Sequence, residues 1–216
     1  MKLKHLLADF DDTVFRHTKD FDAIVRANVV NLLSERYSLG SPSEVQDLIK
    51  DLRRKHGTDV IQCAVAKDGR ISYEEFGRLA YTHRLNELKR IASSNADPEL
   101  TSLLSGLRMD KSILSNSPDF FIKIILKSQG LGEQFENIIG STSLSCDTKP
   151  SPSAYAQAIK ITGYNPENTL YVDDSPKALE VPRQMGMLTV LISSEAKSDK
   201  NASFVVGDLK GLLRML

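Results

Sequence analysis

Two carboxylates at the end of a short apolar run are the first residues that could do chemistry. Asp9 and Asp11 follow residues 6–8, which predict a buried strand that runs into a loop. In an extended backbone, residues two apart project from the same side, so both carboxylates would face one point. One carboxylate of such a pair can act as a nucleophile while the other exchanges a proton. An acidic surface turn is the other interpretation of this segment.

Three further polar segments follow predicted strands. They are Ser115-Asn116, Lys149 and Asp173-Asp174. A hydroxyl beside backbone N–H groups can hold phosphate oxygens before a helix begins. A lysine at a junction between a loop and a helix can offset the charge of a carboxylate and a phosphate together. An added acid pair would complete an oxygen site for a hard cation such as Mg²⁺.

Each of these segments also has a purely structural interpretation. The serines before Pro118 could cap a helix, with Ser117 next to the proline. A loop lysine can simply be solvated, and adjacent aspartates suit a turn. The four segments together favour catalysis, because chance placement of nucleophile, hydroxyl, lysine and acid pair after successive strands is improbable.

The elements that must position these residues alternate between strands and helices. Short apolar runs predict strands near residues 6–10, 112–115, 135–140, 169–172, 188–192 and 204–206. Helical patterns are expected over residues 120–131, 152–163, 176–186 and 209–216. This alternation predicts an α/β protein with a doubly wound parallel sheet, in which ligands bind at the carboxyl ends of the strands.

Residues 16–95 interrupt this alternation directly after the first strand. Apolar residues recur at helical spacing through the segment, and stretches with Gly and Ser separate the helices. The segment is too long and too apolar to be a loop. We therefore expect an all-helical cap domain at residues 16–95, inserted into a core domain of residues 1–15 and 96–216.

Charge and hydropathy limit the classes of partner. The chain has 216 residues with 28 basic and 28 acidic side chains, so its net charge gives no general attraction to nucleic acid or to an anionic membrane. No run approaches the ~20 apolar residues that span a bilayer, and Asp9 interrupts the apolar N-terminal stretch. These features predict a soluble cytoplasmic protein that acts on a small molecule, without a nucleic-acid polymer or a membrane as partner.

The motifs together resemble those of the haloacid dehalogenase superfamily, over residues 6 to about 192. The matching motifs are Asp9-Phe10-Asp11-Asp12-Thr13, Ser115-Asn116, Lys149-Pro150 and Val172-Asp173-Asp174-Ser175. The resemblance implies a Rossmann-like core and Mg²⁺-dependent hydrolysis of a phosphomonoester, with an aspartyl-phosphate formed on Asp9. It implies that Asp11 first protonates the leaving alcohol and then activates water. The acid at Asp11 argues against a dehalogenase, because a halide leaves without a proton.

The same resemblance implies the remaining roles. Mg²⁺ would be held by Asp9, the backbone carbonyl of Asp11, and Asp174, with Asp173 on a metal-bound water, although either member of the acid pair could bind directly. Ser115 and the backbone of Asn116 would hold the phosphate, Lys149 would contact the phosphate and Asp9, and Asp12 and Thr13 would order the loop.

Shorter segments resemble the pyrimidine 5′-nucleotidase group more narrowly. They are His56-Gly57-Thr58, Gly77-Arg78-Leu79-Ala80-Tyr81, Asp97-Pro98-Glu99-Leu100, and Tyr171-Val172-Asp173-Asp174-Ser175 followed by Gly186-Met187-Leu188-Thr189-Val190. This likeness implies a nucleoside 5′-monophosphate as substrate, bound in part by His56 and Thr58 of the cap. Asp59 stands where the group tends to have a second threonine, which leaves the nucleobase preference open.

Two other functions are compatible with these motifs. One is a phosphatase of another small phosphomonoester, such as a sugar phosphate, phosphoglycolate or a lysophosphatidate. The other is a non-catalytic binding or regulatory module on the same fold, which would have lost at least one catalytic group. The basic run Lys50, Arg53, Arg54, Lys55 and His56 could contact an anionic substrate or form a solvated helix face.

Overall fold

The computed structural model describes residues 2–57 and 60–216. The chain divides into two compact units. Met1–Arg16 and Ala92–Leu216 make up the first, which we call the α/β unit, and His17–Ile91 make up the second, which we call the helical unit. The expected cap role of the helical segment stays a prediction.

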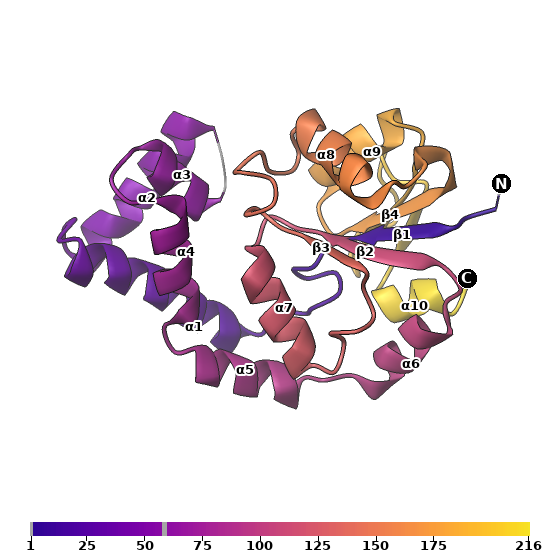
Figure 1. Ribbon diagram of the computed structural model, residues 1–216, viewed down its shortest axis with the longest axis horizontal. Coiled ribbons are helices and arrows are strands. Elements are labelled where there is room, and N and C mark those ends of the chain that lie inside the picture. The colour runs from indigo at the N-terminus through magenta and orange to yellow at the C-terminus, as the bar shows by residue number, and fades with distance from the viewer. Residues whose placement is uncertain (1, 58–59) are drawn as a thin grey trace. The chain divides into compact units, whose positions relative to one another are not determined.

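The described residues of the α/β unit form a six-stranded parallel sheet in the order β3-β2-β1-β4-β5-β6 (Figure 1). The strands are β1 (His5–Ala8), β2 (Asp110–Leu114), β3 (Asn137–Ile139), β4 (Thr169–Asp173), β5 (Leu188–Ile192) and β6 (Phe204–Val206). The chain builds one half of the sheet outward from β1 and then crosses back to place β4 on the other side of β1. This order confirms the predicted doubly wound α/β fold, and it places the topological switch point, where the strand order reverses, between β1 and β4.

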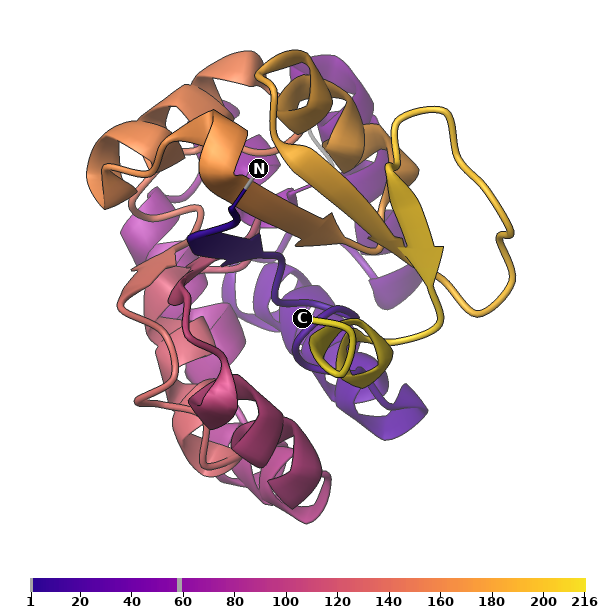
Figure 2. The same ribbon diagram turned by 90° about the vertical axis from the view of Figure 1, so that its right-hand side faces the viewer.

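Helices cover both faces of the sheet. They are α6 (Pro98–Gly106), α7 (Asp119–Ser128), α8 (Pro152–Thr162), α9 (Glu180–Gln184) and α10 (Leu209–Leu213). Figures 1 and 2 show α8 and α9 on one face, and α7 and α10 on the other. Helix α6 was not among the expected helices, although Asp97 caps its N-terminus and Pro98 occupies its first turn. The expected helix at 176–186 is a 3₁₀ turn, Pro176–Leu179, followed by α9.

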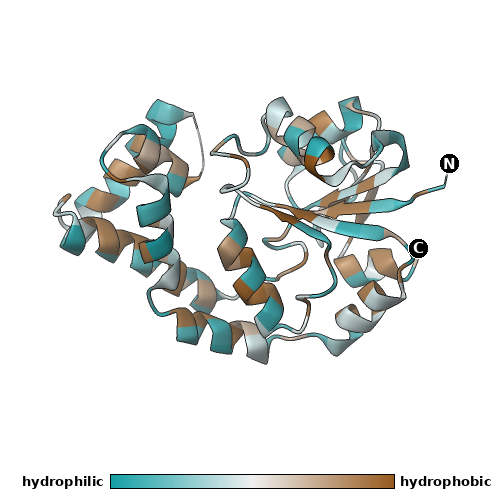
Figure 3. Cartoon of the chain, in the orientation of Figure 1, coloured by the Kyte–Doolittle hydropathy of each residue, from teal (hydrophilic) through white to brown (hydrophobic). Residues whose placement is uncertain are grey.

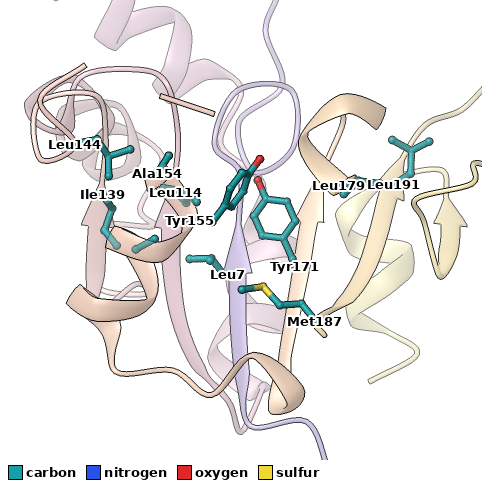
Figure 4. Close-up of a cluster of buried hydrophobic side chains, with 11 residues drawn as sticks. Leu7, Leu114, Ile139, Leu144, Ala154, Tyr155, Tyr171, Leu179, Met187 and Leu191 are labelled. Atoms are coloured by element: carbon teal, nitrogen blue, oxygen red, sulfur yellow. The ribbon is translucent and has the colours of Figure 1, made fainter. Parts of the chain in front are cut away.

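Burial explains why the strands read as continuous apolar runs. Leu6, Leu7 and Ala8 of β1 are fully buried, because a parallel strand covered on both faces exposes neither. Figure 3 shows hydrophobic residues concentrated along the strands and on the inner faces of the helices of this unit. One core cluster includes Leu7, Tyr155 of α8 and Tyr171 of β4 (Figure 4). This packing holds the carboxyl ends of the strands rigidly, which is where the polar segments begin.

The helical unit has an apolar core of its own. Its elements are α1 (Lys19–Asn31), a π-helical segment η1 (Leu32–Arg36), α2 (Pro42–His56), α3 (Ile61–Lys67), α4 (Tyr73–Thr82) and α5 (Leu85–Ser94), which runs on into the α/β unit. Val29, Leu33, Val45 and Phe76 are among the residues that pack together inside it. Such a core is typical of an independently packed domain. No helix within residues 2–57 and 60–216 is long and apolar enough to cross a membrane.

Helices α3 and α4 approach each other closely at Gly77. The buried Gln62 of α3 donates a hydrogen bond from Nε2 to the carbonyl oxygen of Tyr73, at 2.9 Å. A Cβ atom at Gly77 would lie 2.4 Å from the same Nε2 atom. Real Cβ contacts are longer than this, so a side chain at position 77 would have to displace the buried amide of Gln62 and its hydrogen bond to Tyr73.

Candidate active site

The loop after β1 places Asp9 in the interior and Asp11 nearer to solvent. The Asp9 N–H donates to the carbonyl of Val172 at 2.8 Å, which extends the pairing of β1 with β4 by one residue. The chain then turns sharply, with Asp12 in the left-handed region at φ 56° and its N–H donating to the Phe15 carbonyl at 2.8 Å. Asp9 is 5% exposed, whereas Asp11 is only partly buried.

Lys149 lies between two buried carboxylates. Its Nζ atom donates to Asp9 Oδ1 and to Asp173 Oδ2, at 2.7 Å in both cases. The lysine is 8% exposed and Asp173 is 1% exposed. The three groups come from separate segments and form one charged network at the switch point of the sheet. The sequence predicted the Lys149–Asp9 contact through the family resemblance, whereas the Lys149–Asp173 contact is new.

This network carries an excess of negative charge, because two carboxylates face one ammonium group. Burial raises the pKa of Asp9 well above its usual value; the Lys149 ammonium opposes this shift, and the Asp173 carboxylate adds to it. Burial alone would lower the pKa of Lys149, but the Asp173 and Asp9 carboxylates outweigh it and raise that pKa. A further positive charge would therefore favour the ionised form of Asp9.

The backbone of Lys149 is held by the side chain of Asn116. Asn116 Nδ2 donates to the Lys149 carbonyl at 3.0 Å, and the Lys149 N–H donates to Asn116 Oδ1 at 2.9 Å. This reciprocal pair joins the loop after β2 to the loop that carries the lysine. The family resemblance implies only a backbone contact of Asn116 with phosphate, so the positioning role of its side chain is an addition.

Two serine hydroxyls contact the carboxylate of Asp11. Ser115 Oγ and Ser117 Oγ donate to Asp11 Oδ2, at 3.0 and 2.8 Å. Helix α7 has Pro118 as its N-cap, with no side-chain capping bond. The interpretation of Ser117 as a helix cap is therefore wrong, and its hydroxyl instead joins the loop after β2 to the loop after β1.

Tyr171 is a site residue that the sequence analysis missed. Its hydroxyl donates to Asp173 Oδ2 at 2.6 Å, and the Ser175 N–H donates to Asp173 Oδ1 at 2.8 Å. Burial, and then the Asp173 carboxylate, raise the pKa of Tyr171, so the phenol stays protonated as a donor. Alternation along β4 puts Tyr171 and Asp173 on the same face, which is the signal that could have identified it.

Three carboxylates could hold a metal ion. Among the described residues, carboxylate oxygens of Asp9, Asp173 and Asp174 lie within 4.8 Å of one another. An all-oxygen donor set with excess negative charge suits a hard cation such as Mg²⁺. Asp174 is exposed, yet the partial withdrawal of its carboxyl from water, and then the carboxylates of Asp173 and Asp12, raise its pKa to about 6. The predicted contribution of the Asp11 backbone carbonyl stays a prediction.

The remaining loop residues differ in their surroundings. Thr13 is buried, and its Oγ1 has no hydrogen-bond partner within the described part of the chain. Asp12 is exposed at the left-handed turn. The backbone conformation at Asp12 therefore shapes the loop, whereas the hydroxyl of Thr13 contributes no described bond to its order.

The predicted substrate-binding residues of the cap belong to the helical unit. His56 ends α2, and its Nε2 lies 3.3 Å from Asp68 Oδ1, while Thr58 lies outside the described residues. Lys55 Nζ and Arg70 Nε also contact Asp68, each at 2.5 Å. Their hydrogen bonds hold the pKa of Asp68 well below its usual value. A role for His56 and Thr58 in substrate binding stays a prediction.

Part of the basic run on α2 forms local ion pairs. Lys50 pairs with Asp47, and Arg54 with Asp51, each one turn apart and exposed to solvent. These contacts agree with a solvated helix face, and exposed pairs of this kind contribute little to stability.

The fold and the site define a class of α/β hydrolase with a buried aspartate, a lysine and an acid pair at the ends of parallel strands. Residues 3–186 match the family model of haloacid dehalogenase-like hydrolases. The chain belongs to this family.

Known proteins with similar sequences or structures include phosphatases. N-acetylmuramic acid 6-phosphate phosphatase of Pseudomonas putida is 26% identical over 200 residues, which cover 89% of this chain and 83% of that protein. A phosphoglycolate phosphatase of Pseudomonas syringae pv. tomato is 25% identical over 120 residues, which cover 53% of this chain and 44% of that protein. The crystal structure of a HAD phosphatase from Thermococcus onnurineus is similar in fold, with a TM-score of 0.70 and 19% identity over 99% of this chain and 97% of that chain.

These comparisons confirm the resemblance to the superfamily and correct the narrower one. The relatives are named for a sugar phosphate and for phosphoglycolate, and they do not support a pyrimidine 5′-nucleotidase. The narrower resemblance depended on short segments of both units, and two positions of one segment, Thr58 and Asp59, lie outside the described residues. The alternative of another small phosphomonoester is better supported.

Proposed function

We propose that the protein is a Mg²⁺-dependent phosphatase of a small phosphomonoester, such as a sugar phosphate or phosphoglycolate. The observation that carries the proposal is the buried network in which Lys149 Nζ lies 2.7 Å from both Asp9 Oδ1 and Asp173 Oδ2. A buried carboxylate held by a lysine beside further carboxylates is suited to nucleophilic attack on an anionic ester, provided that a cation balances the charge. Phosphatases among the relatives support this choice.

In the first half of the reaction, Asp9 attacks phosphorus. Lys149 holds Oδ1 of Asp9, which leaves the second carboxylate oxygen to form the new bond. The bond between phosphorus and the ester oxygen breaks, and Asp11 donates a proton to the departing alkoxide. The products of this half are a free alcohol and an aspartyl-phosphate on Asp9.

In the second half, Asp11 accepts a proton from a water molecule. The resulting hydroxide attacks the phosphorus of the aspartyl-phosphate, and the bond to the Asp9 oxygen breaks. Inorganic phosphate leaves, and both carboxylates return to their starting states. The ammonium of Lys149 offsets charge on the Asp9 carboxylate throughout.

Ser115 and Asn116 would bind the phosphate group. Ser115 Oγ lies at the carboxyl end of β2, in the loop beside Asp11, and backbone N–H groups follow it in that loop. Phosphate oxygens accept hydrogen bonds from such a combination of hydroxyl and N–H donors. The side chain of Asn116 would act separately, because it keeps the backbone of Lys149 in place.

The two aspartates of the acid pair have different roles: Asp174 would bind the metal, and Asp173 pairs with Lys149. Both oxygens of Asp173 already accept hydrogen bonds, from Lys149, Tyr171 and Ser175. Asp174 is therefore the better direct ligand for Mg²⁺, together with Asp9 and the Asp11 backbone carbonyl, and Asp173 would contact a metal-bound water. A bound Mg²⁺ would supply positive charge that offsets the repulsion between an anionic nucleophile and an anionic ester.

The test is phosphate release by purified protein from a panel of esters with Mg²⁺ or with EDTA. The panel contains N-acetylmuramic acid 6-phosphate, glucose 6-phosphate, phosphoglycolate, UMP and CMP. Asp9→Asn should abolish release, because an amide is a poor nucleophile, while Asp47→Asn at an exposed site of α2 should leave it unchanged. Near wild-type turnover by Asp9→Asn would refute the nucleophile, and a preference for UMP or CMP would restore the nucleotide as substrate.

The helical unit would act as the cap that selects the alcohol part of the substrate. His56 is the candidate contact that the sequence singles out, and its Nε2 atom lies 3.3 Å from Asp68 Oδ1. His56→Ala should change the ratio of kcat/KM between sugar phosphate and phosphoglycolate. His83→Ala, at an exposed histidine of the same unit, should leave that ratio unchanged. Equal behaviour of the two variants would remove His56 from substrate selection.

A further inference from the structure

Asp11 and the phosphate group would compete for the hydroxyl of Ser115. Ser115 Oγ accepts a hydrogen bond from the Ser117 N–H at 3.0 Å and donates its proton to Asp11 Oδ2 at 3.0 Å. A serine hydroxyl has a single proton to donate. When Ser115 donates to a phosphate oxygen, as the proposed function requires, its bond to Asp11 must break. The carboxylate that delivers the proton would then lose this support during the reaction.

Ser117 can keep its bond to Asp11 when Ser115 turns away. Its Oγ donates to the same Asp11 Oδ2 atom at 2.8 Å, which is the shorter of the two hydroxyl contacts. Since the two hydroxyls come from separate residues, release of one leaves the other in place.

Hydrogen bonds join the backbone of Ser117 and the side chain of Asp119 to the loop after β3. The Ser117 carbonyl accepts a hydrogen bond from the Ser141 N–H at 3.0 Å. A Cβ at Gly140 would lie 2.3 Å from that same carbonyl oxygen, so the two backbones are in direct contact. The buried Asp119 then accepts from the N–H groups of Gly140 and Ser143, each at 3.0 Å. The Ser117 hydroxyl is thus presented from a segment tied to the loop after β3.

We propose that Ser117 is a positioning residue for the proton transfer by Asp11. It holds the Asp11 carboxyl group toward the ester oxygen while Ser115 binds the phosphate. This inference depends on the proposed phosphatase function. It differs from a purely structural role, in which the hydroxyl of Ser117 would only order the loop after β1.

The two roles predict different dependences on the leaving group. An alkyl phosphate releases a poor leaving group and needs the proton from Asp11, whereas p-nitrophenyl phosphate releases a stable phenolate and does not. The ratio kcat/KM reports the steps up to departure of the alcohol, so it is not affected by Asp11 as the base in the second half. Loss of positioning should therefore lower kcat/KM for the alkyl ester alone.

The experiment compares glycerol phosphate with p-nitrophenyl phosphate. With Ser117→Ala, kcat/KM for glycerol phosphate should fall about tenfold, a part of the ~10²–10⁴ that general acid catalysis contributes. The value for p-nitrophenyl phosphate should change less than about twofold. Ser117→Thr keeps a hydroxyl, so its kcat/KM for glycerol phosphate should be close to that of the wild-type protein. Ser128→Ala removes a hydroxyl at the far end of α7 that donates to the Ile124 carbonyl of the same helix, and it should change neither value.

Thermal unfolding of each variant shows whether it folds. Should Ser117→Ala fail to fold, Ser117→Val against Ser117→Thr repeats the comparison with two side chains of the same shape. An equal fall for both esters, or no fall for either, overturns the positioning role and leaves the phosphatase function intact. If the wild-type protein hydrolyses neither ester nor any ester of the larger panel, the proposed function is wrong and this inference falls with it.

Discussion

The pair Tyr171 and Tyr155 offers a matched test of the buried charge network. Both phenols are fully buried, with ring centroids 5.7 Å apart in an edge-on arrangement, and Figure 4 shows their hydroxyls pointing toward the carboxyl end of β1. Tyr171 donates to the carboxylate of Asp173 at 2.6 Å, whereas Tyr155 donates to the backbone carbonyl of Ala178 at 2.8 Å. Replacement by phenylalanine removes one hydroxyl in each case and keeps the ring.

The acceptor decides the size of each effect. A hydrogen bond to a charged group contributes about 1.5–3 kcal/mol, and a neutral one about 0.5–1.5 kcal/mol. Tyr171→Phe should therefore lose about 1–2 kcal/mol more of the free energy of unfolding than Tyr155→Phe. Asp173 keeps its bonds from Lys149 and Ser175, so the site should survive in a loosened form. We expect kcat to fall about tenfold, which corresponds to about 1.4 kcal/mol.

Urea unfolding gives the free energies, and phosphate release with Mg²⁺ gives kcat. Tyr155→Phe should keep kcat within about twofold, because the Tyr155 hydroxyl donates to an uncharged backbone carbonyl and not to a carboxylate of the site. The reasoning would be refuted by equal losses of stability in the two variants together with equal turnover. In that case the hydroxyl of Tyr171 would contribute no more to Asp173 than an ordinary buried hydrogen bond does.

Three further predictions concern other parts of the chain. Asp68→Asn should lower the unfolding temperature at pH 7, and the difference from wild type should shrink progressively as the pH falls from about 4 toward 2, because a carboxyl with a depressed folded pKa stabilises fully only above its unfolded pKa and loses that contribution as the pH falls toward its folded pKa. A difference in thermal unfolding as large at pH 2 as at pH 7 would contradict this. Gly77→Ala should cost about 1–3 kcal/mol in urea unfolding, because the new Cβ would displace the amide of Gln62, and a second change, Gln62→Ala, should remove the clash; additive losses would be the contrary result. Affinity for Mn²⁺ in calorimetry should fall as the pH is lowered from about 7 to about 5, since Asp174, with a pKa of about 6, takes up a proton in that range; constant affinity would exclude Asp174 as a ligand.

The positions of Asp9 and Asp173 could be predicted from the sequence, because each follows or ends a short apolar run that is typical of a buried strand. Asp9 follows a run of residues that are fully buried, and Asp173 ends a strand that is buried throughout. Parallel strands bring such ends to one edge of the sheet whatever the intervening chain does. Tyr171 lies two residues before Asp173 and so shares its face of the strand. It was missed because a tyrosine within an apolar strand is usually a core residue.

Other contacts depend on tertiary packing that local patterns do not contain. Ser117 lies before Pro118 and looks like a helix cap, yet its hydroxyl bonds to Asp11, 106 residues earlier in the chain. The side chain of Asn116 bonds to the backbone of Lys149, 33 residues later. Backbone groups carry no sequence signature, so the second contact has no counterpart in any motif. Substrate choice is still harder to predict, because the narrower resemblance came from short segments that the relatives do not support.

The hydrogen bonds between Asn116 and Lys149 separate two properties of the site. The amide of Asn116 contacts the peptide groups of residue 149 and not its side chain. The path of the loop is therefore set by one residue and the charge delivered along it by another. A truncated side chain at position 149 would leave the carboxylates of Asp9 and Asp173 without their shared ammonium group, while the bonds from Asn116 to the backbone would remain. The backbone position of residue 149 and the charge of its side chain therefore depend on different contacts. Another cationic side chain at position 149 would keep the hydrogen bonds that Asn116 makes to the loop.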